Sequence, residues 1–259
     1  MIKAAFFDLD GTLLSHRTGS VPAGTRRSLE LLRAGGIKIY LSTGRHIREI
    51  RRLPAADISF DGYVTLNGHI CLDDRKQKLF GLPFPRKTAD ALIDIFQKHR
   101  LPLVLVEESG LTLNFVNDTV VRAMKSVSTP IPGVAEYKGE PIYQACAFVP
   151  REEDDRIRAL LPRDCHLARW NDNGIDVIPE GGGKTVGIRF FIEREGILPE
   201  ECIAFGDAEN DIEMLTFCGI GVAMGNSRDK VKEIADYVTT DIDDNGIEKA
   251  LIFFGLIQG

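Results

Sequence analysis

Short apolar runs that each end in polar residues recur along the first part of the chain. Residues 2–7 (IKAAFF) run up to Asp8, and residues 37–41 (IKIYL) run up to Ser42. Continuous runs of this length are typical of strands that are buried on both faces of a sheet. Between the two runs, residues 25–34 place leucines at helical spacing and are followed by two glycines, which predicts a helix and its end.

The last third of the chain repeats this alternation of strand and helix. There, strands are predicted at 202–205, 220–224 and 237–240, and helices at 184–196, 210–217, 227–235 and 246–254. In the first part of the chain, a further strand is predicted at 63–66, and a basic helix is predicted to begin within 45–52. Alternating strands and helices form a mainly parallel sheet with helices on both faces. The predicted fold class is therefore α/β, with a Rossmann-like, doubly wound parallel sheet.

The middle of the chain has a different pattern. Pro83 and Pro85 open it, and alternating apolar runs follow at 103–106, 111–116 and 144–149. Such a change of pattern indicates a separate α+β insertion. We expect a core formed by residues 1–82 plus 184–259 and an inserted domain formed by residues 83–183.

Composition and charge exclude several classes of protein. The 259 residues are 44% hydrophobic and 27% charged, which is an ordinary globular balance. A net charge of −6 argues against a dedicated nucleic-acid binder. No apolar stretch approaches the roughly 18 residues of a membrane span, and Asp8 comes too early for a signal peptide, so we expect a cytoplasmic protein without a membrane partner. The five cysteines form no CxxC pair, so we expect buried free thiols and neither a disulfide framework nor a zinc cluster.

Polar clusters follow three of the predicted strands. They are DLDGT at 8–12, STGR at 42–45 and GDAEND at 206–211. In a parallel sheet the carboxyl ends of the strands meet at one edge, where ligands bind. One such cluster is explained by turn and helix-cap chemistry alone, but three in register predict a common pocket.

Four carboxylates would meet in that pocket: those of Asp8, Asp10, Asp207 and Asp211. Like charges so close together cannot all stay ionised without a counter-charge. A divalent cation supplies it, and oxygen ligands without nearby Cys or His favour Mg²⁺.

The same motifs resemble a known family. DLDGT, STGR, the lysine of GGGKT and GDxxND at 206–211 look like the four motifs of the haloacid dehalogenase-like superfamily, and their order and spacing cover essentially the whole chain. Asn67-Gly68, VAMGN at 222–226 and the position of the insertion resemble the Cof-type subfamily, type IIB, which carries a large α/β cap.

The resemblance implies a role for each matching residue. Asp8 would be the nucleophile that forms an aspartyl phosphate, and Asp10 the general acid and base. The implied phosphate-binding residues are Thr43, Gly44, Lys184 and Asn210, and the implied Mg²⁺ ligands are Asp8, Asp10, Asp207 and Asp211. Arg45, Asn67, Asn117 and Arg169 are candidates for contact with the substrate or the cap.

The resemblance thus implies a Mg²⁺-dependent phosphatase acting on small phosphorylated metabolites, with sugar phosphates as the first expectation. We expect no nucleic-acid partner and a monomer or weak homodimer. Two alternatives stay open: a phosphomutase or phosphotransferase that uses the same intermediate, and a non-catalytic protein that binds phosphorylated metabolites. A third interpretation, that GGGKT ends a P-loop, needs a glycine where the chain has Ile178.

Overall fold

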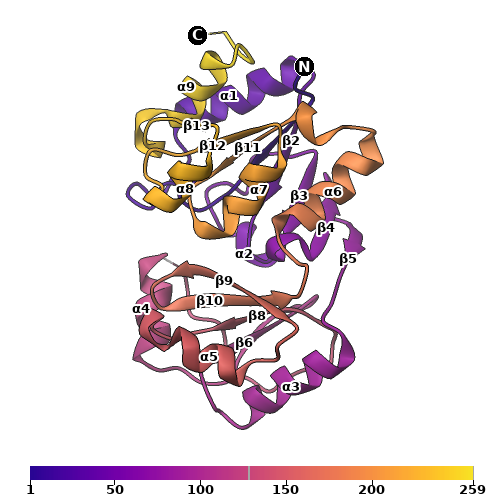
Figure 1. Cartoon of the computed structure of the whole chain (residues 1–259), viewed down its shortest axis with the longest axis vertical. Coiled ribbons are helices and arrows are strands. Elements are labelled where there is room, and N and C mark those ends of the chain that lie inside the picture. The colour runs from indigo at the N-terminus through magenta and orange to yellow at the C-terminus, as the bar shows by residue number, and fades with distance from the viewer. Residues whose placement is uncertain (128, 259) are drawn as a thin grey trace. The chain divides into compact units, whose positions relative to one another are not determined.

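The chain divides into two compact units. The structure, a computed structural model, describes residues 1–127 and 129–258. Unit 1 comprises Met1–Phe80 and Gly183–Gly259, and unit 2 comprises Gly81–Gly182. These bounds differ by a residue or two from the division that the sequence pattern suggests. Each unit is built around its own sheet (Figure 1).

The described part of unit 1 contains an eight-stranded sheet in the order β13-β12-β11-β1-β2-β3-β4-β5. The strands are β1 (Ala4–Phe7), β2 (Lys38–Ser42), β3 (Gly62–Thr65), β4 (Ile70–Asp73), β5 (Lys78–Gly81), β11 (Cys202–Gly206), β12 (Ile220–Ala223) and β13 (Tyr237–Val238). Neighbouring strands from β13 to β3 are parallel, and β4 runs antiparallel to β3. The sheet is therefore mainly parallel, as the alternation of strand and helix predicts.

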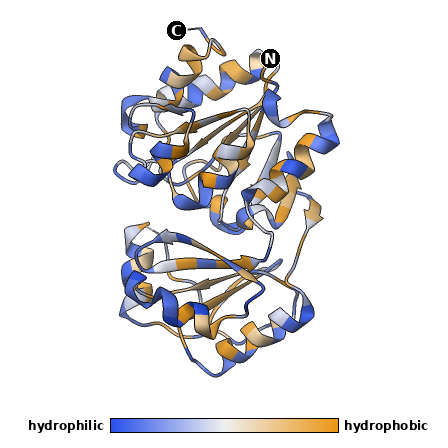
Figure 2. Ribbon diagram, viewed as in Figure 1, coloured by the Kyte–Doolittle hydropathy of each residue, from blue (hydrophilic) through white to orange (hydrophobic). Residues whose placement is uncertain are grey.

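Helices cover both faces of this sheet (Figure 1). They are α1 (Ala23–Ala34), α2 (Ile47–Ile50), α6 (Lys184–Glu195), α7 (Ile212–Phe217), α8 (Asp229–Ile234) and α9 (Gly246–Phe253). Helices α6, α7 and α8 share one apolar core with the sheet, in which Tyr40 stacks on Phe6 at 4.9 Å between ring centroids and lies 4.7 Å from Phe191. Helix α1 packs against α9 and β2. The sheet is thus doubly wound, and its central strand β1, in which Ala4–Phe7 are all buried, is apolar on both faces (Figure 2).

The register of the central strands decides where the polar clusters lie. Phe7 at the end of β1 pairs with Leu41 of β2 on one side and with Phe205 of β11 on the other. The residues that follow these three positions therefore leave the sheet together at its carboxyl edge. This alignment brings the loops after β1, β2 and β11 to one place.

Unit 2 is an α+β unit, as its alternating pattern predicts. Its five-stranded antiparallel sheet has the order β7-β6-β8-β10-β9. Its elements are α3 (Arg86–Gln97), β6 (Leu103–Glu107), β7 (Gly110–Leu113), α4 (Asp118–Ser126), β8 (Ile142–Ala147), α5 (Asp154–Leu160), β9 (Cys165–Asn171) and β10 (Gly174–Pro179). Leu92 and Ile95 of α3 and Ile157 of α5 pack on the sheet in its core.

Several predicted elements differ from the observed ones in length. The strand predicted within 111–116 ends at Leu113. There the side-chain oxygen of Asn114, in place of a backbone carbonyl, accepts the hydrogen bond from the backbone N–H of Leu103. The basic helix of 45–52 is the single turn α2, and Pro54 follows closely and disfavours continuation. The last strand, predicted at 237–240, covers only Tyr237–Val238.

Candidate active site

Three carboxylates meet at the carboxyl edge of the unit 1 sheet, as the sequence predicts. Oxygens of Asp8, Asp207 and Asp211 lie within 4.8 Å of one another. Asp8 follows β1, and the other two stand in the loop after β11. Asp8 and Asp211 are buried, with exposures of 5% and 0%. The side chain of the fourth predicted carboxylate, Asp10, points to a different partner, described below.

Lys184 is the counter-charge of this cluster. It is the first residue of α6 and is buried, and its Nζ lies 2.5 Å from Oδ1 of both Asp8 and Asp211. Burial, together with the charge of Asp211, raises the pKa of Asp8 to about 7, although Lys184 opposes the shift. Burial and the charge of Asp8 likewise raise the pKa of Asp207 well above its usual value. Three carboxylates thus share the ammonium group of Lys184 in a buried place.

Two glycines allow α6 to bring Lys184 to the carboxylates. Gly68 has a φ of +91°, and a Cβ there would lie 2.3 Å from the carbonyl oxygen of Gly183. A Cβ on Gly187 would lie 2.5 Å from Cγ1 of Val64. Only glycine fits such positions, so the first turn of α6 packs directly on the Asn67-Gly68 turn.

Asp211 organises the loop in which Asp207 stands. Its Oδ2 accepts from the backbone N–H groups of Asp207 and Ala208, both at 3.0 Å, while its Oδ1 accepts from Lys184. Both of its oxygens therefore accept hydrogen bonds, and Oδ1, which accepts one, keeps a lone pair for a cation. Asp207 is held from the other side, because its Oδ1 accepts from the Thr12 hydroxyl at 2.9 Å.

Asp207 also packs against the backbone of the DLDGT loop. Gly11 has a φ of +86°, and a Cβ at that position would lie 2.3 Å from Oδ2 of Asp207. The glycine of the motif therefore serves two purposes: it adopts the left-handed turn and leaves the space that the Asp207 carboxylate occupies.

Asp10 is held by Arg45. Nε and Nη2 of Arg45 donate to the two oxygens of Asp10 at 2.6 and 2.8 Å, which is a bidentate pair. Glu49 supports this arginine: its Oε1 lies 3.8 Å from Nη1 of Arg45, and its Oε2 accepts from the N–H of His46. Sequence reasoning singled out Arg45 but missed Glu49; the spacing of His46 and Glu49, which is that of a helix capping box, is the signal that could have found it.

The other predicted phosphate-binding residues stand in the loops that follow β2 and β11. Thr43 is buried directly after β2, and its Oγ1 accepts from the N–H of Arg45 at 3.1 Å; Gly44 stands between them in the same loop. Asn210 donates to Oδ1 of Asn67 at 3.3 Å. Among the described residues, Oδ1 of Asn210 is buried without a hydrogen-bond partner. A buried acceptor without a donor costs free energy, so a donor or cation brought by a ligand would stabilise this loop.

Asn226 is a further residue at this edge that sequence reasoning left without a role. Its Nδ2 donates to the carbonyl of Gly11 at 2.8 Å, and its Oδ1 accepts from the N–H of Ile242 at 3.0 Å. It ties the DLDGT loop to the C-terminal part of the chain. Its place directly after VAMG was the only signal in the sequence.

Two predicted substrate contacts lie in unit 2 and have structural partners there. Asn117 caps α4 by accepting from the N–H of Val120 at 3.0 Å. Arg169 is buried, pairs with Asp154 and donates to the carbonyl of Asn171 at 3.1 Å. Their contact with a substrate stays a prediction.

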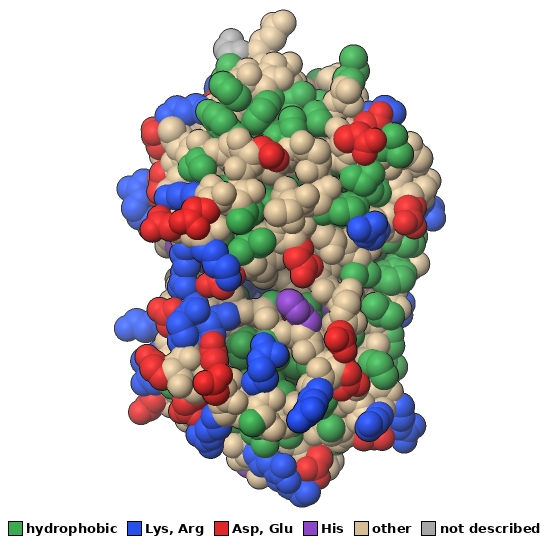
Figure 3. All heavy atoms as spheres, viewed as in Figure 1, with side chains coloured by type: hydrophobic (Ala, Val, Ile, Leu, Met, Phe, Trp, Pro, Cys, Tyr) green, Lys and Arg blue, Asp and Glu red, His purple; other side chains and the backbone are tan. Residues whose placement is uncertain are grey.

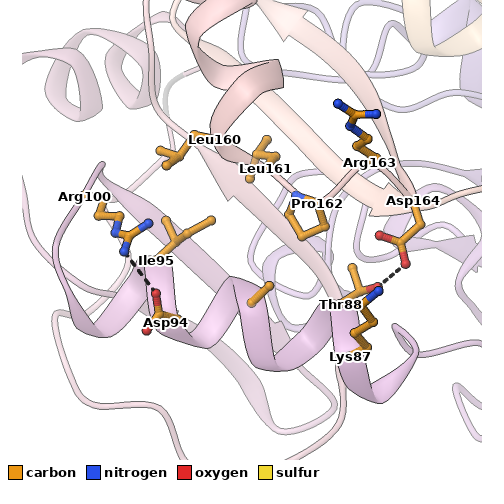
Figure 4. Close-up of a pocket in the computed structure, with 11 residues that line it drawn as sticks. Lys87, Thr88, Asp94, Ile95, Arg100, Leu160, Leu161, Pro162, Arg163 and Asp164 are labelled. Atoms are coloured by element: carbon orange, nitrogen blue, oxygen red, sulfur yellow. Dashed lines mark hydrogen bonds and ion pairs between the residues drawn. The ribbon is translucent and has the colours of Figure 1, made fainter.

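Unit 2 also contains a groove of about 600 Å³ between α3 and the segment that follows α5 (Figure 4). Its acidic residues are already paired: Asp94 with Lys98 and Arg100, and Asp164 with the hydroxyl of Thr88. None of the predicted site residues lines it. The groove is therefore separate from the carboxylate cluster.

The surface shows no concentration of one charge on the face that Figure 3 draws. Side chains of both charges are interspersed over the face shown in Figure 3. Among the described residues, no helix is both long enough and apolar enough to cross a bilayer.

The cluster has the donor set of a divalent-cation site. Oxygens of three acidic residues converge, and no cysteine or histidine belongs to the group. Burial first, and then the neighbouring carboxylates, raise the pKa of Asp8 and of Asp207, so a bound cation would stabilise their ionised forms. Hard cations prefer such ligands. The residues present therefore fit a divalent metal.

A doubly wound sheet with an aspartate after its central strand, a buried lysine and an acidic loop defines a phosphoryl-transfer site of the haloacid dehalogenase type, and the comparisons agree. The profile described as haloacid dehalogenase-like hydrolase matches residues 5–251. The chain is 30% identical to the HMP-PP phosphatase of Serratia proteamaculans, over 90% of this chain and 88% of that protein.

Solved structures give the same answer. The sugar phosphatase BT4131, described as HAD subclass IIB, superimposes with a TM-score of 0.87 at 34% identity and covers 98% of this chain and 100% of its own. The phosphatase BT1666 from Bacteroides thetaiotaomicron superimposes with a TM-score of 0.88 at 31% identity, and the match covers 99% of this chain and 96% of that chain. The chain belongs to the haloacid dehalogenase-like hydrolase family, in its Cof-type branch, and is a phosphoric monoester hydrolase.

Proposed function

We propose that this phosphatase hydrolyses small phosphorylated metabolites, sugar phosphates above all, with Mg²⁺ and through an aspartyl phosphate on Asp8. The observation that carries the mechanism is the position of Asp8 at the end of β1, where Lys184 and the two other carboxylates converge on it. The likeness to a sugar phosphatase at 34% identity supports the substrate class.

Asp8 and Asp10 divide the chemistry between them. A carboxylate oxygen of Asp8 attacks phosphorus, the bond from phosphorus to the leaving oxygen breaks, and Asp10 gives that oxygen a proton. Asp10 then takes a proton from water, whose oxygen attacks phosphorus and breaks the bond to Asp8. Phosphate leaves, and both carboxylates return to their initial state.

Other residues of the chain stabilise the charge that builds up on the phosphoryl group. Lys184 is already 2.5 Å from Asp8 and neutralises charge on the nucleophile and the phosphoryl oxygens. Thr43 accepts a hydrogen bond from Arg45, which leaves its own hydroxyl hydrogen for a phosphoryl oxygen. Asp8, Asp207, the backbone carbonyl of Asp10 and Asp211 would hold Mg²⁺. When bound, that ion supplies positive charge to the phosphoryl oxygens.

Arg45 sets a condition on the cycle. While the guanidinium donates to both oxygens of Asp10, that carboxylate cannot donate a proton to a leaving group. Asp10 therefore has to exchange Arg45 for the leaving oxygen when substrate binds.

The burst of p-nitrophenol from p-nitrophenyl phosphate tests the separate roles of Asp8 as nucleophile and Asp10 as general acid and base. Its leaving group needs no acid, so Asp10→Asn should release about one equivalent of p-nitrophenol per enzyme and then stall as a phosphoenzyme. Asp8→Asn should give neither burst nor turnover, whereas Asp74→Asn, at an exposed acidic residue, should match wild type. Turnover by Asp8→Asn at more than a small fraction of wild type would contradict the nucleophile assignment.

The substrate class is tested by phosphate release from hexose and pentose phosphates, pyrimidine phosphates and an aryl phosphate, with Mg²⁺ and with EDTA. We expect the highest kcat/KM on sugar phosphates and no turnover in EDTA. A clear preference for the pyrimidine phosphates would overturn the substrate class and leave the mechanism intact, whereas undiminished turnover in EDTA would overturn the role of the metal. Isomerisation of a sugar phosphate without release of phosphate would indicate a mutase.

A further inference from the structure

The guanidinium of Arg45 stands between two carboxylates, those of Asp10 and Glu49. Its Nε and Nη2 donate to the two oxygens of Asp10 at 2.6 and 2.8 Å. Its Nη1 lies 3.8 Å from Oε1 of Glu49. The second contact is an ion pair that has not closed to the roughly 2.7–3.2 Å of an N–H···O hydrogen bond. A shift of about 0.6 Å is enough to close it.

The start of α2 holds Glu49 in this position. Oε2 of Glu49 accepts from the N–H of His46 at 2.9 Å, and Nδ1 of His46 accepts from the N–H of Arg48 at 3.1 Å, which together form the capping box of the helix. Burial raises the pKa of Glu49, and the charge of Arg45 opposes that shift. Glu49 and Arg45 are both partly buried, so salt screens their attraction less than it screens a surface pair.

The proposed reaction takes Asp10 away from Arg45. Asp10 cannot give a proton to the leaving oxygen while both of its oxygens accept from the guanidinium. When one of these oxygens turns to the leaving group, Arg45 loses an acceptor, and a partly buried charge that loses its partner is costly. The carboxylate of Glu49 can replace that acceptor, because it already lies beside Nη1.

We infer that Glu49 is a positioning residue for the acid step, which takes up Arg45 when Asp10 turns to the leaving oxygen. The inference rests on the role of Asp10 as general acid in the proposed function. With the charge of Glu49 in place, the contact that Arg45 loses at Asp10 is offset by the contact that it gains at Glu49. Without that charge, Arg45 stays on Asp10 and keeps both of its oxygens engaged, which slows the transfer of the proton.

The first turnover on two aryl phosphates with different leaving groups tests this role. p-Nitrophenol leaves without an acid, whereas phenol, a poorer leaving group, needs the proton of Asp10. Glu49→Gln removes the charge and keeps a side-chain oxygen that can accept from the N–H of His46. Because general acid catalysis contributes roughly 10²–10⁴-fold, we expect this variant to slow the release of phenol about 10-fold and to leave the rate of the p-nitrophenol burst unchanged.

Two further comparisons separate this role from a structural one. Asp57→Asn is the matched control, since Asp57 pairs with Arg26 and is 69% exposed, and it should match wild type on both substrates. In an Asp10→Asn background, Glu49→Gln should slow the release of phenol no further, because Glu49 acts through Asp10. Equal slowing of both leaving groups, slowing that persists in the Asp10→Asn background, or no slowing at all would each overturn the inference.

A crystal structure of the wild-type protein with Mg²⁺ and vanadate tests the movement without a variant. We expect one hydrogen bond between Arg45 and Asp10 to be lost, and Nη1 of Arg45 to approach Oε1 of Glu49 to about 3 Å. A bidentate pair of Arg45 and Asp10 that persists, with Nη1 still 3.8 Å from Glu49, would contradict the inference.

The Asp10→Asn variant also distinguishes a failure of this inference from a failure of the proposed function. If Asp10→Asn releases phenol as fast as wild type, Asp10 is not the acid, and the proposed function fails at that step together with the role of Glu49. If Asp10→Asn is slow and Glu49→Gln is not, only the role of Glu49 is wrong.

Discussion

Lys184 joins two acidic residues that lie far apart in the sequence, and its charge is what the cluster depends on. We expect Lys184→Met to lower kcat by at least about 100-fold, since it removes a group that stabilises developing charge. In metal-free protein the same change should lower the free energy of unfolding by about 3–5 kcal/mol, because buried carboxylates lose their partner. Urea unfolding in EDTA measures this loss.

The matched control for that variant is Lys38→Met. Lys38 pairs with Glu195 but is 41% exposed, and an exposed pair contributes about 1 kcal/mol or less. If both methionine variants lose the same stability, the burial of Lys184 does not have the consequence described here.

The carboxylates also predict how the stability of the metal-free protein depends on pH. The pKa of Asp8 rises from 3.8 to about 7 on folding, so the folded state binds more protons than the unfolded state between these values. The resulting stability is present in full at low pH and is lost as the pH rises through about 7. Urea unfolding in EDTA should therefore show a larger loss between pH 5 and pH 8 for wild type than for Asp8→Asn. Equal losses would show that Asp8 does not titrate in this way.

At the scale of elements, the turn at Asn67-Gly68 positions the start of α6. We expect Gly68→Ala to cost more than about 2 kcal/mol, because its Cβ would meet the carbonyl of Gly183 at 2.3 Å and move Lys184 away from Asp8. Gly36→Ala is the matched control: its φ is also positive, +79°, but its Cβ would meet nothing within 4 Å. Thermal unfolding together with kcat separates the two effects: Gly36→Ala should lose some stability and no activity. Equal losses of activity would contradict the placement of α6 by this turn.

At the scale of the whole molecule, the carboxylate cluster belongs to unit 1 and the single tryptophan, Trp170, to unit 2. A ligand stabilises the cooperative unit that binds it, so two units that unfold separately respond differently. Mg²⁺ should therefore slow the exchange of amide hydrogens in β1 and β11 of unit 1. The unfolding transition that Trp170 fluorescence reports for unit 2 should stay unchanged. Asp207→Asn should abolish the effect of Mg²⁺. Equal shifts in both units would show that they unfold as one.

The sequence by itself determined the alternation of strand and helix, the insertion and the meeting of the polar loops. Apolar runs that end in Asp8, Ser42 and Gly206 specify parallel strands, and parallel strands bring their carboxyl ends to one edge whatever their separation along the chain. For the same reason Asp8 and Asp207 could be named as neighbours before their positions were known, whereas Lys184 was implied only by the resemblance of GGGKT to a family motif.

Only the tertiary structure decided how the side chains at that edge are partnered. No local pattern shows that Arg45 holds Asp10, or that the two oxygens of Asp211 accept from the loop of Asp207 and from Lys184. Register, rotamer and burial fix these contacts, and each depends on residues from several elements packed together. Pairwise contacts across a fold are not encoded by spacing along one segment. The sequence therefore located the site, and only the structure showed which side chains pair within it.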